Sequence, residues 1–424
     1  MSFLLANLWV GGVLIVAVVA AYVVAVLYGM LGRLQFESSM RQRQIEEMDI
    51  AIDRARRRMQ ANVEKSLSWA GTRKFVVARR QVECDDGNVC SFYLEPHDKK
   101  PIPAFEPGQY LTFDLAIPGE KKKVTRCYSL SDAPNGERYR VSIKRVPPPR
   151  DAPEAPPGLS SNYFHDHVNE GDVLDVRAPG GKFFLDMNSD RPIVLIGGGV
   201  GLTPVLSMLN TVVASNADRE VWFFYGIRNG TEHCMKEHLR EIAAAHSNVH
   251  IVNCYSDPRD IDEQGVDYDE ASRVSVDLMK RLLPSNNYQF LMCGPPPMME
   301  SLISDLEEWG VPAEDILRES FGPASGRKAP PKEVNPDAAG PEITFKRSGK
   351  VVHWDPAFDN LVKFAEANDC DIPYACLAGN CGTCLTTVLE GEVDYPGGAT
   401  DFEAEEGTCL TCSCVPKGPV VLDA

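Results

Sequence analysis

Four stretches of the chain differ in how apolar and polar residues follow one another. Residues 2–32 contain no charged residue and form an apolar run long enough to cross a bilayer at about 1.5 Å per residue. Residues 73–188 contain short alternating runs such as RYRVSIK and no long helical period, which predicts an antiparallel β-barrel. Residues 189–322 alternate apolar runs with helical stretches, which predicts an α/β doubly wound sheet. Residues 341–424 open with a strand, a turn, a second strand and a helix, so a multidomain chain with an α+β final domain is expected.

The N-terminal run predicts a transmembrane helix. No Lys or Arg precedes it, which favours a permanent anchor over a cleaved signal peptide. A buried core helix is disfavoured, because helices in globular domains are seldom apolar on every face over such a length. Seven arginines follow between positions 33 and 58. By the positive-inside rule, residues 1–32 are expected to form a single-pass anchor in the inner (cytoplasmic) membrane, followed by a basic juxtamembrane helical segment at 33–72 and cytoplasmic domains.

The length and the charge of the chain limit the number of domains and the kinds of partner to expect. A chain of 424 residues is too long for one ordinary core and is expected to form several domains. Its net charge of -17 argues against a nucleic-acid partner, since a phosphate backbone needs a basic surface. Residues 1–80 carry 12 basic and 6 acidic side chains, whereas residues 338–424 carry 5 and 14. The basic excess near the N-terminus and the acidic excess near the C-terminus indicate that the two ends of the chain interact with different partners.

The cysteines near the C-terminus predict a metal centre. The chain has 13 cysteines, and a reducing cytoplasm disfavours disulfides. In CLAGNCGTC, the cysteines Cys376, Cys381 and Cys384 are separated by four and then two residues, the spacing of plant-type 2Fe-2S ferredoxins. The fourth ligand is one of the three cysteines in TCLTCSC, residues 408–414. A zinc ribbon built from the two CxxC pairs is the alternative, but it leaves Cys376 unused and does not require the small residues that fill the loop.

Two further motifs suggest nucleotides. In RPIVLIGGGVGLTP, a buried strand runs into glycines and then a helix, an arrangement that lets the backbone and the helix N-terminus approach a pyrophosphate. Leu202 stands where the usual fingerprint has a third glycine, so a tight strand-helix turn is an equal alternative for this motif taken alone. The strand-to-helix pattern recurs at YQFLMCGPPPMM. VTRCYSLSD offers a cation, an aromatic ring and a hydroxyl suited to a flavin, although an ordinary half-exposed strand fits its periodicity better.

These motifs occur in a recognisable order. They are Arg126-Cys-Tyr128-Ser129, then GGGVGLTP at 197–204, Cys293-Gly294-Pro295 and Ser320-Phe321-Gly322. Together they resemble the ferredoxin-NADP reductase superfamily. With the C-terminal ferredoxin, the order of domains is similar to that of oxygenase reductases of the phthalate dioxygenase reductase type. The resemblance covers about residues 73–424, and the membrane anchor is an addition to it.

The resemblance implies roles at the flavin. Arg126 is expected to hold the pyrophosphate of the flavin, Tyr128 to stack on its ring and Ser129 to hydrogen-bond near its reactive nitrogen. Phe321 is expected to cover the other face until nicotinamide displaces it. Ser161 and Asn162 lie in a segment that resembles flavohaemoglobins and are expected to meet the diphosphate, which favours FAD over FMN. In the same segment, His165 and His167 are expected to be polar surface residues rather than ligands.

The resemblance also assigns residues to the other two cofactors. Gly199, Gly201 and Thr203 are expected beneath the pyrophosphate of NADH, with Cys293 and Gly294 beside the nicotinamide. Among the open ligand candidates, the ferredoxin pattern Leu-Thr-Cys followed by a proline four residues later selects Cys412 ahead of Cys414. The predicted 2Fe-2S ligands are therefore Cys376, Cys381, Cys384 and Cys412. Cys370 lies outside the spacing and is expected to be structural.

The implied function is electron transfer. NADH delivers two electrons as a hydride and a 2Fe-2S cluster accepts one at a time, so a flavin has to stand between them. The expected domains are FAD-binding at 73–188, NAD-binding at 189–322, a Pro-rich linker at 323–340 and 2Fe-2S ferredoxin at 341–424. The main hypothesis is a membrane-anchored NADH-dependent reductase serving a terminal oxygenase, a hydroxylase or desaturase. The alternatives are a respiratory NADH:quinone dehydrogenase subunit and a non-catalytic, membrane-tethered ferredoxin carrier without flavin.

Overall fold

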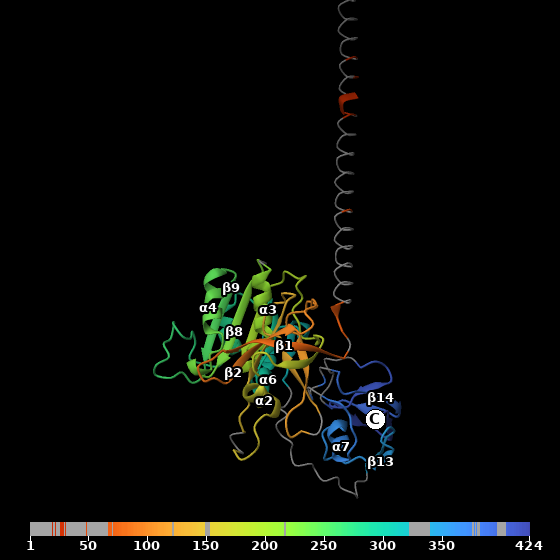
Figure 1. Ribbon diagram of the computed structural model, residues 1–424. Coiled ribbons are helices and arrows are strands. Elements are labelled where there is room, and N and C mark those ends of the chain that lie inside the picture. The colour runs from red at the N-terminus through yellow and green to blue at the C-terminus, as the bar shows by residue number, and fades with distance from the viewer. Residues whose placement is uncertain are drawn as a thin grey trace, which may run out of the picture. The chain divides into compact units, whose positions relative to one another are not determined.

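The computed structural model describes most of the chain after residue 66. The described residues are 67–69, 71–120, 123–148, 153–215, 218–321, 340–374, 377, 379, 382–396 and 404–424, with isolated positions at 19, 22, 26–28, 30 and 48. The chain divides into two compact units, Met1–Leu67 and Ser68–Ala424, and each is considered by itself. Several secondary-structure elements of the second unit are labelled in Figure 1.

The first part of the second unit is an antiparallel barrel. Its strands are β1 (Thr72–Val82), β2 (Val89–Pro96), β3 (Tyr110–Leu115), β4 (Val124–Ser129), β5 (Tyr139–Lys144) and β6 (Val173–Arg177). They lie in the order β4-β3-β6-β1-β2-β5, and all pairings are antiparallel. An antiparallel bridge between Leu130, just after β4, and Val141 in β5 joins the two outer strands. The predicted barrel is confirmed.

A helix that the sequence did not reveal packs on this barrel. Helix α2 (Leu159–His167) buries Phe164, whose ring makes edge contacts with Phe92 and Phe113 at centroid separations of 5.2 and 5.3 Å. The prediction of a surface position is wrong for His165, because its ring is buried and its Nε2 lies 2.8 Å from the carbonyl oxygen of Ile143. Burial lowers the pKa of His165. His167 is exposed, as expected.

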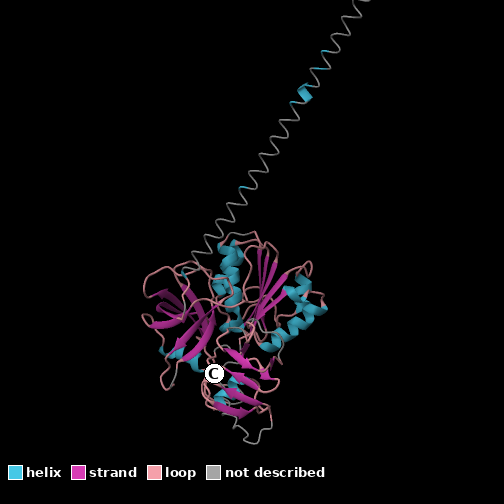
Figure 2. Cartoon of the chain, turned by 90° about the vertical axis from the view of Figure 1, so that its right-hand side faces the viewer, coloured by secondary structure: helices cyan, strands magenta, loops and turns pink. Residues whose placement is uncertain are grey.

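The second part is a parallel sheet. Its strands are β7 (Ile193–Gly198), β8 (Val221–Ile227), β9 (Val249–Tyr255), β10 (Gln289–Cys293) and β11 (Ile316–Glu319). The order is β11-β10-β7-β8-β9, and every pairing is parallel. The helices are α3 (Leu202–Ala214), α4 (Lys236–Ala245), α5 (Val276–Leu282) and α6 (Pro296–Glu308), and Figure 2 shows helices on both faces of this sheet. The doubly wound prediction is confirmed.

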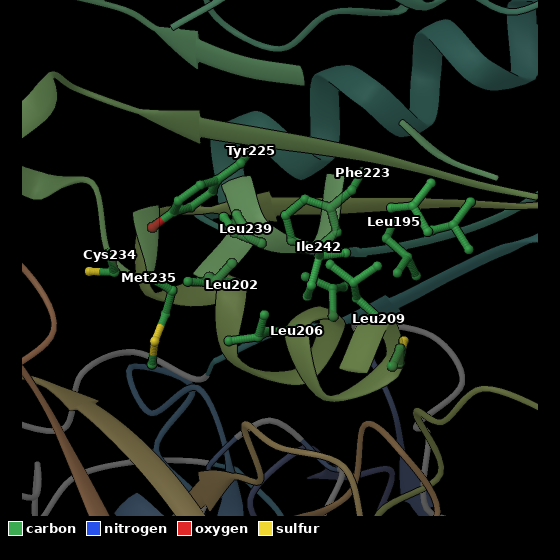
Figure 3. Close-up of a cluster of buried hydrophobic side chains, with 14 of the residues drawn as sticks. Leu195, Leu202, Leu206, Leu209, Phe223, Tyr225, Cys234, Met235, Leu239 and Ile242 are labelled. Carbon is green, nitrogen blue, oxygen red and sulfur yellow. The ribbon is translucent and has the colours of Figure 1, made fainter. Parts of the chain in front are cut away.

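Each strand of this sheet contributes to two cores, because successive side chains point to opposite faces. In β7, Leu195 packs with Leu206 of α3 and Leu239 of α4, whereas Val194 packs with the helices of the other face. Figure 3 shows the first cluster, with α3 side chains against Phe223 and Leu195. Strands buried on both faces read as continuous apolar runs, which is why the sequence pattern identified them.

The third part is an α+β domain. Strands β12 (Glu342–Phe345) and β13 (Lys350–His353) form an antiparallel pair, followed by helix α7 (Leu361–Ala367) in the predicted order. Later strands are β14 (Leu385–Glu390), β15 (Val393–Asp394), β16 (Thr408–Leu410), β17 (Val415–Pro416) and β18 (Val420–Leu422). The main sheet has the order β13-β12-β18-β14-β16. Cys370 is 4% exposed in its core, consistent with a structural role.

Three predicted segments fall mostly beyond the described residues. No helix among the positions that the structure describes is long and apolar enough to cross a bilayer. The apolar run at 2–32, the basic segment at 33–72 and the linker at 323–340 lie largely outside the described residues. The anchor and the linker therefore stay predictions.

Candidate functional site

Strand β4 presents the predicted flavin residues. The ring of Tyr128 makes edge contacts with Phe113 and Phe164 at centroid separations of 5.8 and 5.2 Å, which fix its orientation. Burial raises the pKa of Tyr128, so the phenol stays protonated. Two residues earlier on the strand, Arg126 donates from Nη1 to the carbonyl oxygen of Thr125 at 2.6 Å. A rigid aromatic ring and a guanidinium therefore lie close together along one strand of the barrel, as a flavin site requires.

The next residue, Ser129, connects the barrel to the parallel sheet. Its hydroxyl donates to Oε2 of Glu319 at 3.0 Å, and both side chains are buried. Glu319 is the last residue of β11 and pairs in register with Cys293, the last residue of β10. Burial, and after it the charge of Glu319, raises the pKa of Cys293, so this thiol stays neutral. The structure thus brings together a hydroxyl, a carboxylate and a thiol from three strands.

Glu319 was missed by sequence reasoning. It immediately precedes the Ser320-Phe321-Gly322 motif, and its position at the carboxyl end of a parallel strand was the only available signal. Phe321, two residues later, is 38% exposed, so its ring is available to cover a ligand. Its contact with a flavin stays a prediction.

The glycine loop after β7 packs against the loop after β10. A Cβ on Gly201 would lie 2.2 Å from the carbonyl oxygen of Cys293 and 2.8 Å from the backbone nitrogen of Gly294. A Cβ on Gly198 would lie 2.8 Å from Cδ of Pro295. These close approaches require glycine. They hold the two loops together at the point where the strand order reverses between β7 and β10, the usual place for a nucleotide in such sheets.

Helix α3 starts directly after the glycine loop, so the free N–H groups of its first turn lie beside that loop. The hydroxyl of Thr203 donates to the carbonyl oxygen of Val200 at 3.1 Å, which holds the turn in place. Gly199 has a φ of +55°, and a Cβ there would meet nothing within 4 Å. An open glycine surface, a helix N-terminus and tightly joined loops fit the pyrophosphate of a dinucleotide.

The start of α2 is the predicted FAD diphosphate site. The amide nitrogen of Asn162 donates to the carbonyl oxygens of Val146 and Gly158 at 2.9 and 2.7 Å, and the Ser161 hydroxyl accepts from the backbone N–H of Val146. Both side chains therefore hold the preceding loop, and their direct contact with FAD stays a prediction. The buried hydroxyl of Ser160 has no hydrogen-bond partner among the described residues, and a bound phosphate would supply one.

Two of the described cysteines of the last domain, Cys384 and Cys412, lie in neighbouring segments of the chain. Cys384 and Cys412 are 2% and 4% exposed, and the carbonyl oxygen of Cys384 accepts from the hydroxyl of Thr411 at 2.8 Å. Pairing of Leu385 in β14 with Leu410 in β16 brings the two segments together. Cys376 and Cys381 lie outside the described residues. The assignment of Cys376, Cys381, Cys384 and Cys412 as ligands therefore stays a prediction.

Cys414, the alternative fourth ligand, is fully buried. A hydrogen bond with Cys409, together with burial, raises the pKa of its thiol. Its carbonyl oxygen accepts from the backbone N–H of Leu361, the first residue of α7, and the carbonyl oxygen of Thr411 accepts from that of Val362. These two hydrogen bonds therefore hold residues 411–414 against the first turn of helix α7.

Three protein-family models match the chain. The oxidoreductase FAD-binding domain matches residues 74–185, the oxidoreductase NAD-binding domain matches residues 195–303, and the 2Fe-2S iron-sulfur cluster binding domain matches residues 343–417. These matches support the FAD, NADH and 2Fe-2S sites, and the match to the iron-sulfur model favours a cluster over a zinc ribbon. The FAD-binding match also excludes the flavin-less carrier.

Relatives support the same assignment. The chain is 40% identical over 256 residues to a flavohemoprotein of Halalkalibacterium halodurans, covering 60% of this chain. It spans about three fifths of the length of such relatives, 61% in this case. The flavohem-like FAD/NAD-binding domain of nitric oxide dioxygenase from Vibrio cholerae is 33% identical with a TM-score of 0.53, and covers 60% of this chain and 100% of that one.

Phthalate dioxygenase reductase, described as a modular structure for electron transfer from pyridine nucleotides to [2Fe-2S], shares the fold. It covers 84% of this chain and 98% of that one with a TM-score of 0.51 and 23% identity. The family matches in this order fit a flavin- and nicotinamide-binding protein. The close packing of the two glycine loops and the Ser129–Glu319–Cys293 group fit the same kind of protein. The chain therefore belongs to the ferredoxin-NADP reductase superfamily, as an NAD(P)H-dependent oxidoreductase with FAD-binding, NAD-binding and 2Fe-2S domains.

Proposed function

We propose that the chain is a membrane-anchored reductase that passes electrons from NADH through FAD and a 2Fe-2S cluster to a terminal oxygenase, a hydroxylase or desaturase. The observation that carries this proposal is the presence of all three redox domains in one chain behind an uncharged N-terminal run. The expected location is the inner (cytoplasmic) membrane, with the catalytic domains in the cytoplasm. The fold shared with phthalate dioxygenase reductase supports an oxygenase as acceptor.

The residues of the site have distinct tasks in this scheme. FAD, when bound, accepts a hydride and releases electrons singly. The glycine loop and the start of α3 would hold the NADH pyrophosphate, and the backbone of Cys293 would lie at the nicotinamide end. The Ser129 hydroxyl donates a hydrogen bond to Glu319, so the lone pairs of its oxygen would be free to accept from an N–H group of the bound flavin. The neutral thiol of Cys293 adds no charge beside the reacting carbon.

Removal of the predicted anchor is expected to affect one activity of the protein and to leave another nearly unchanged. Deleting residues 1–32 is expected to leave NADH-to-ferricyanide turnover nearly unchanged, because the flavin and nicotinamide sites lie within residues 73–322. Electron delivery to the native acceptor in membranes is expected to fall sharply, because the anchor raises the local concentration of the reductase at the bilayer. Both rates are measured on full-length and truncated protein at equal flavin content. Equal rates with membranes would rule out a membrane-bound oxygenase.

The same preparations test the respiratory alternative. A quinone analogue is added to the full-length protein in membranes, and its reduction is compared with substrate-dependent oxygen consumption. We expect oxygen consumption that depends on an oxygenase substrate and slow quinone reduction. The opposite ratio would identify a quinone reductase. The acidic excess of residues 338–424 predicts that transfer to the acceptor weakens as salt concentration rises.

A further inference from the structure

A polar link joins the barrel to helix α3. Three residues after Ser129, the carbonyl oxygen of Asp132 accepts from the hydroxyl of Ser207 at 2.8 Å. Its carboxylate Oδ1 accepts from the amide nitrogen of Asn210 at 2.9 Å. Ser207 and Asn210 are one turn apart on α3 and are both buried. We call these contacts the Asp132 clamp.

The clamp is supported on both sides. In the barrel, the Arg140 guanidinium lies 3.5 Å from Asp132 Oδ1 and donates from Nε to the Ser131 hydroxyl at 3.2 Å. In the parallel-sheet domain, Nε2 of His238 on α4 lies 2.8 Å from the amide oxygen of Asn210. Burial, and after it the charge of Arg140, lowers the pKa of His238, so the ring is neutral. Since both ends are held by further hydrogen bonds, the clamp fixes a distance rather than only adding a contact.

The clamp joins two short stretches of chain, one leading to the predicted flavin site and the other to the predicted NADH site. On one side, Asp132 is three residues from Ser129, which is predicted to lie at the flavin site. On the other, helix α3 begins at the glycine loop, which is predicted to lie beneath the NADH pyrophosphate. A shift of α3 relative to β4 would therefore change the separation of nicotinamide and flavin. Hydride transfer is sensitive to such shifts, and a displacement of about 1 Å can slow a reaction by about a hundredfold.

We propose that Asp132 is a positioning residue for hydride transfer from NADH to FAD. It acts through Ser207 and Asn210 by setting where the glycine loop stands relative to the flavin. This assignment concerns the first electron-transfer step and holds for any terminal acceptor. The ion pair between Lys144 and Glu232, at 3.1 Å, also joins the two domains. Its side chains are 32% and 29% exposed and it does not involve α3, so it serves as a matched control.

The test uses the FAD-loaded full-length protein and its flavin-free form. The variants are Asp132→Ala, Asn210→Ala, the double variant, Asp132→Asn and the control Glu232→Gln. Rapid mixing with NADH gives the rate of flavin reduction, the NADH dissociation constant and the charge-transfer absorbance of the NADH–flavin complex. Hydrogen exchange of residues 202–214 in the flavin-free protein reports the clamp without any turnover.

We expect Asp132→Ala and Asn210→Ala to slow flavin reduction by roughly tenfold or more, to weaken the charge-transfer band and to speed exchange in α3. NADH affinity should change by less than about threefold, because the pyrophosphate loop is intact. The double variant should be no slower than either single one, since both remove the same link. Asp132→Asn keeps the accepting oxygen and should restore most of the rate, and Glu232→Gln should match the wild type.

Two results would overturn the assignment. One is an unchanged reduction rate and absorbance band in a folded Asn210→Ala protein. The other is an equal loss in Glu232→Gln, which would mean that any contact between the domains has this effect. If Asp132→Ala fails to fold, Ser207→Ala combined with Asn210→Ala decides the question, because it removes both hydrogen bonds of the clamp, to the backbone carbonyl and to the carboxylate of Asp132, while leaving Asp132 and Arg140 paired.

Discussion

Replacing Gly201 by alanine tests whether the function depends on close packing between the glycine loop after β7 and the loop after β10. The added Cβ would lie 2.2 Å from the carbonyl oxygen and 2.5 Å from the carbonyl carbon of Cys293. Real Cβ contacts shorter than 3.0 Å essentially never occur, so the loops must separate by about 0.8 Å. Both partners are backbone atoms at the ends of buried strands, and neither can rotate away as a side chain would.

The substitution is expected to lower both the stability of the protein and the rate of flavin reduction. Overpacking of this kind destabilises a protein by about 1–3 kcal/mol, which lowers the Tm by several degrees. Separation of the loops would also move the predicted site for the NADH pyrophosphate away from the predicted site for the nicotinamide. We therefore expect flavin reduction to slow by about tenfold to a hundredfold. The FAD content should not change, because the barrel is untouched.

The assay is single-turnover reduction of bound FAD by NADH, with Tm measured on the same samples. Gly226→Ala is the matched control, because this glycine lies on β8 of the same sheet and a Cβ there meets the side chain of Val274 at 3.2 Å, which can yield. We expect the control to stay within about twofold of the wild-type rate. A Gly201→Ala protein with wild-type Tm and wild-type reduction rate would refute the argument from backbone contact.

Three other predictions concern the iron-sulfur ligands, the flavin site and a buried histidine. Cys412→Ser is expected to abolish the 2Fe-2S signal in the spectrum of the reduced protein and Cys414→Ser to spare it, and the reverse pattern would exchange the two assignments. Arg126→Ala should lower the FAD content after purification, because a cation paired with the pyrophosphate is lost; full FAD occupancy would contradict that role. Burial lowers the pKa of His233 from 6.5 to about 3, so its neutral form favours the folded state and stability should decline as the pH falls from about 6.5 toward 3. His233→Phe should flatten this decline in a series of Tm measurements, and an equally steep decline would show that other groups cause it.

The sequence predicted the sheets well because their patterns are local. The strands of the parallel sheet are continuous apolar runs, and β5 alternates visibly in RYRVSIK. Helix α2 was not predicted, because its stability comes from Phe164 packing on Phe92 and Phe113, residues far away in sequence. His165 was placed wrongly for the same reason, since its burial depends on that packing.

The site was predictable only where a motif marks it. Arg126, Tyr128, Ser129 and Cys293 stand in short recognisable strings, and the structure joins two of them through Glu319. Glu319 lies outside these strings, and the structure reveals it through the hydrogen bond from Ser129 and the register of β10 with β11. The Asp132 clamp was equally hidden, because a contact between residues 78 positions apart leaves no local pattern.

The pairing of β14 with β16 has a consequence for how the iron-sulfur domain acquires its cluster. Bringing two positions about 28 residues apart into contact costs a flexible chain about 3 kcal/mol of entropy. Here the pairing of the strands and a hydrogen bond between protein atoms hold Cys384 beside Thr411, the neighbour of Cys412. Incoming iron and sulfide therefore do not have to supply that closure energy. The domain is expected to keep its fold when the cluster is lost and to be reloaded without unfolding, unlike small metal-binding domains that order only around their ion.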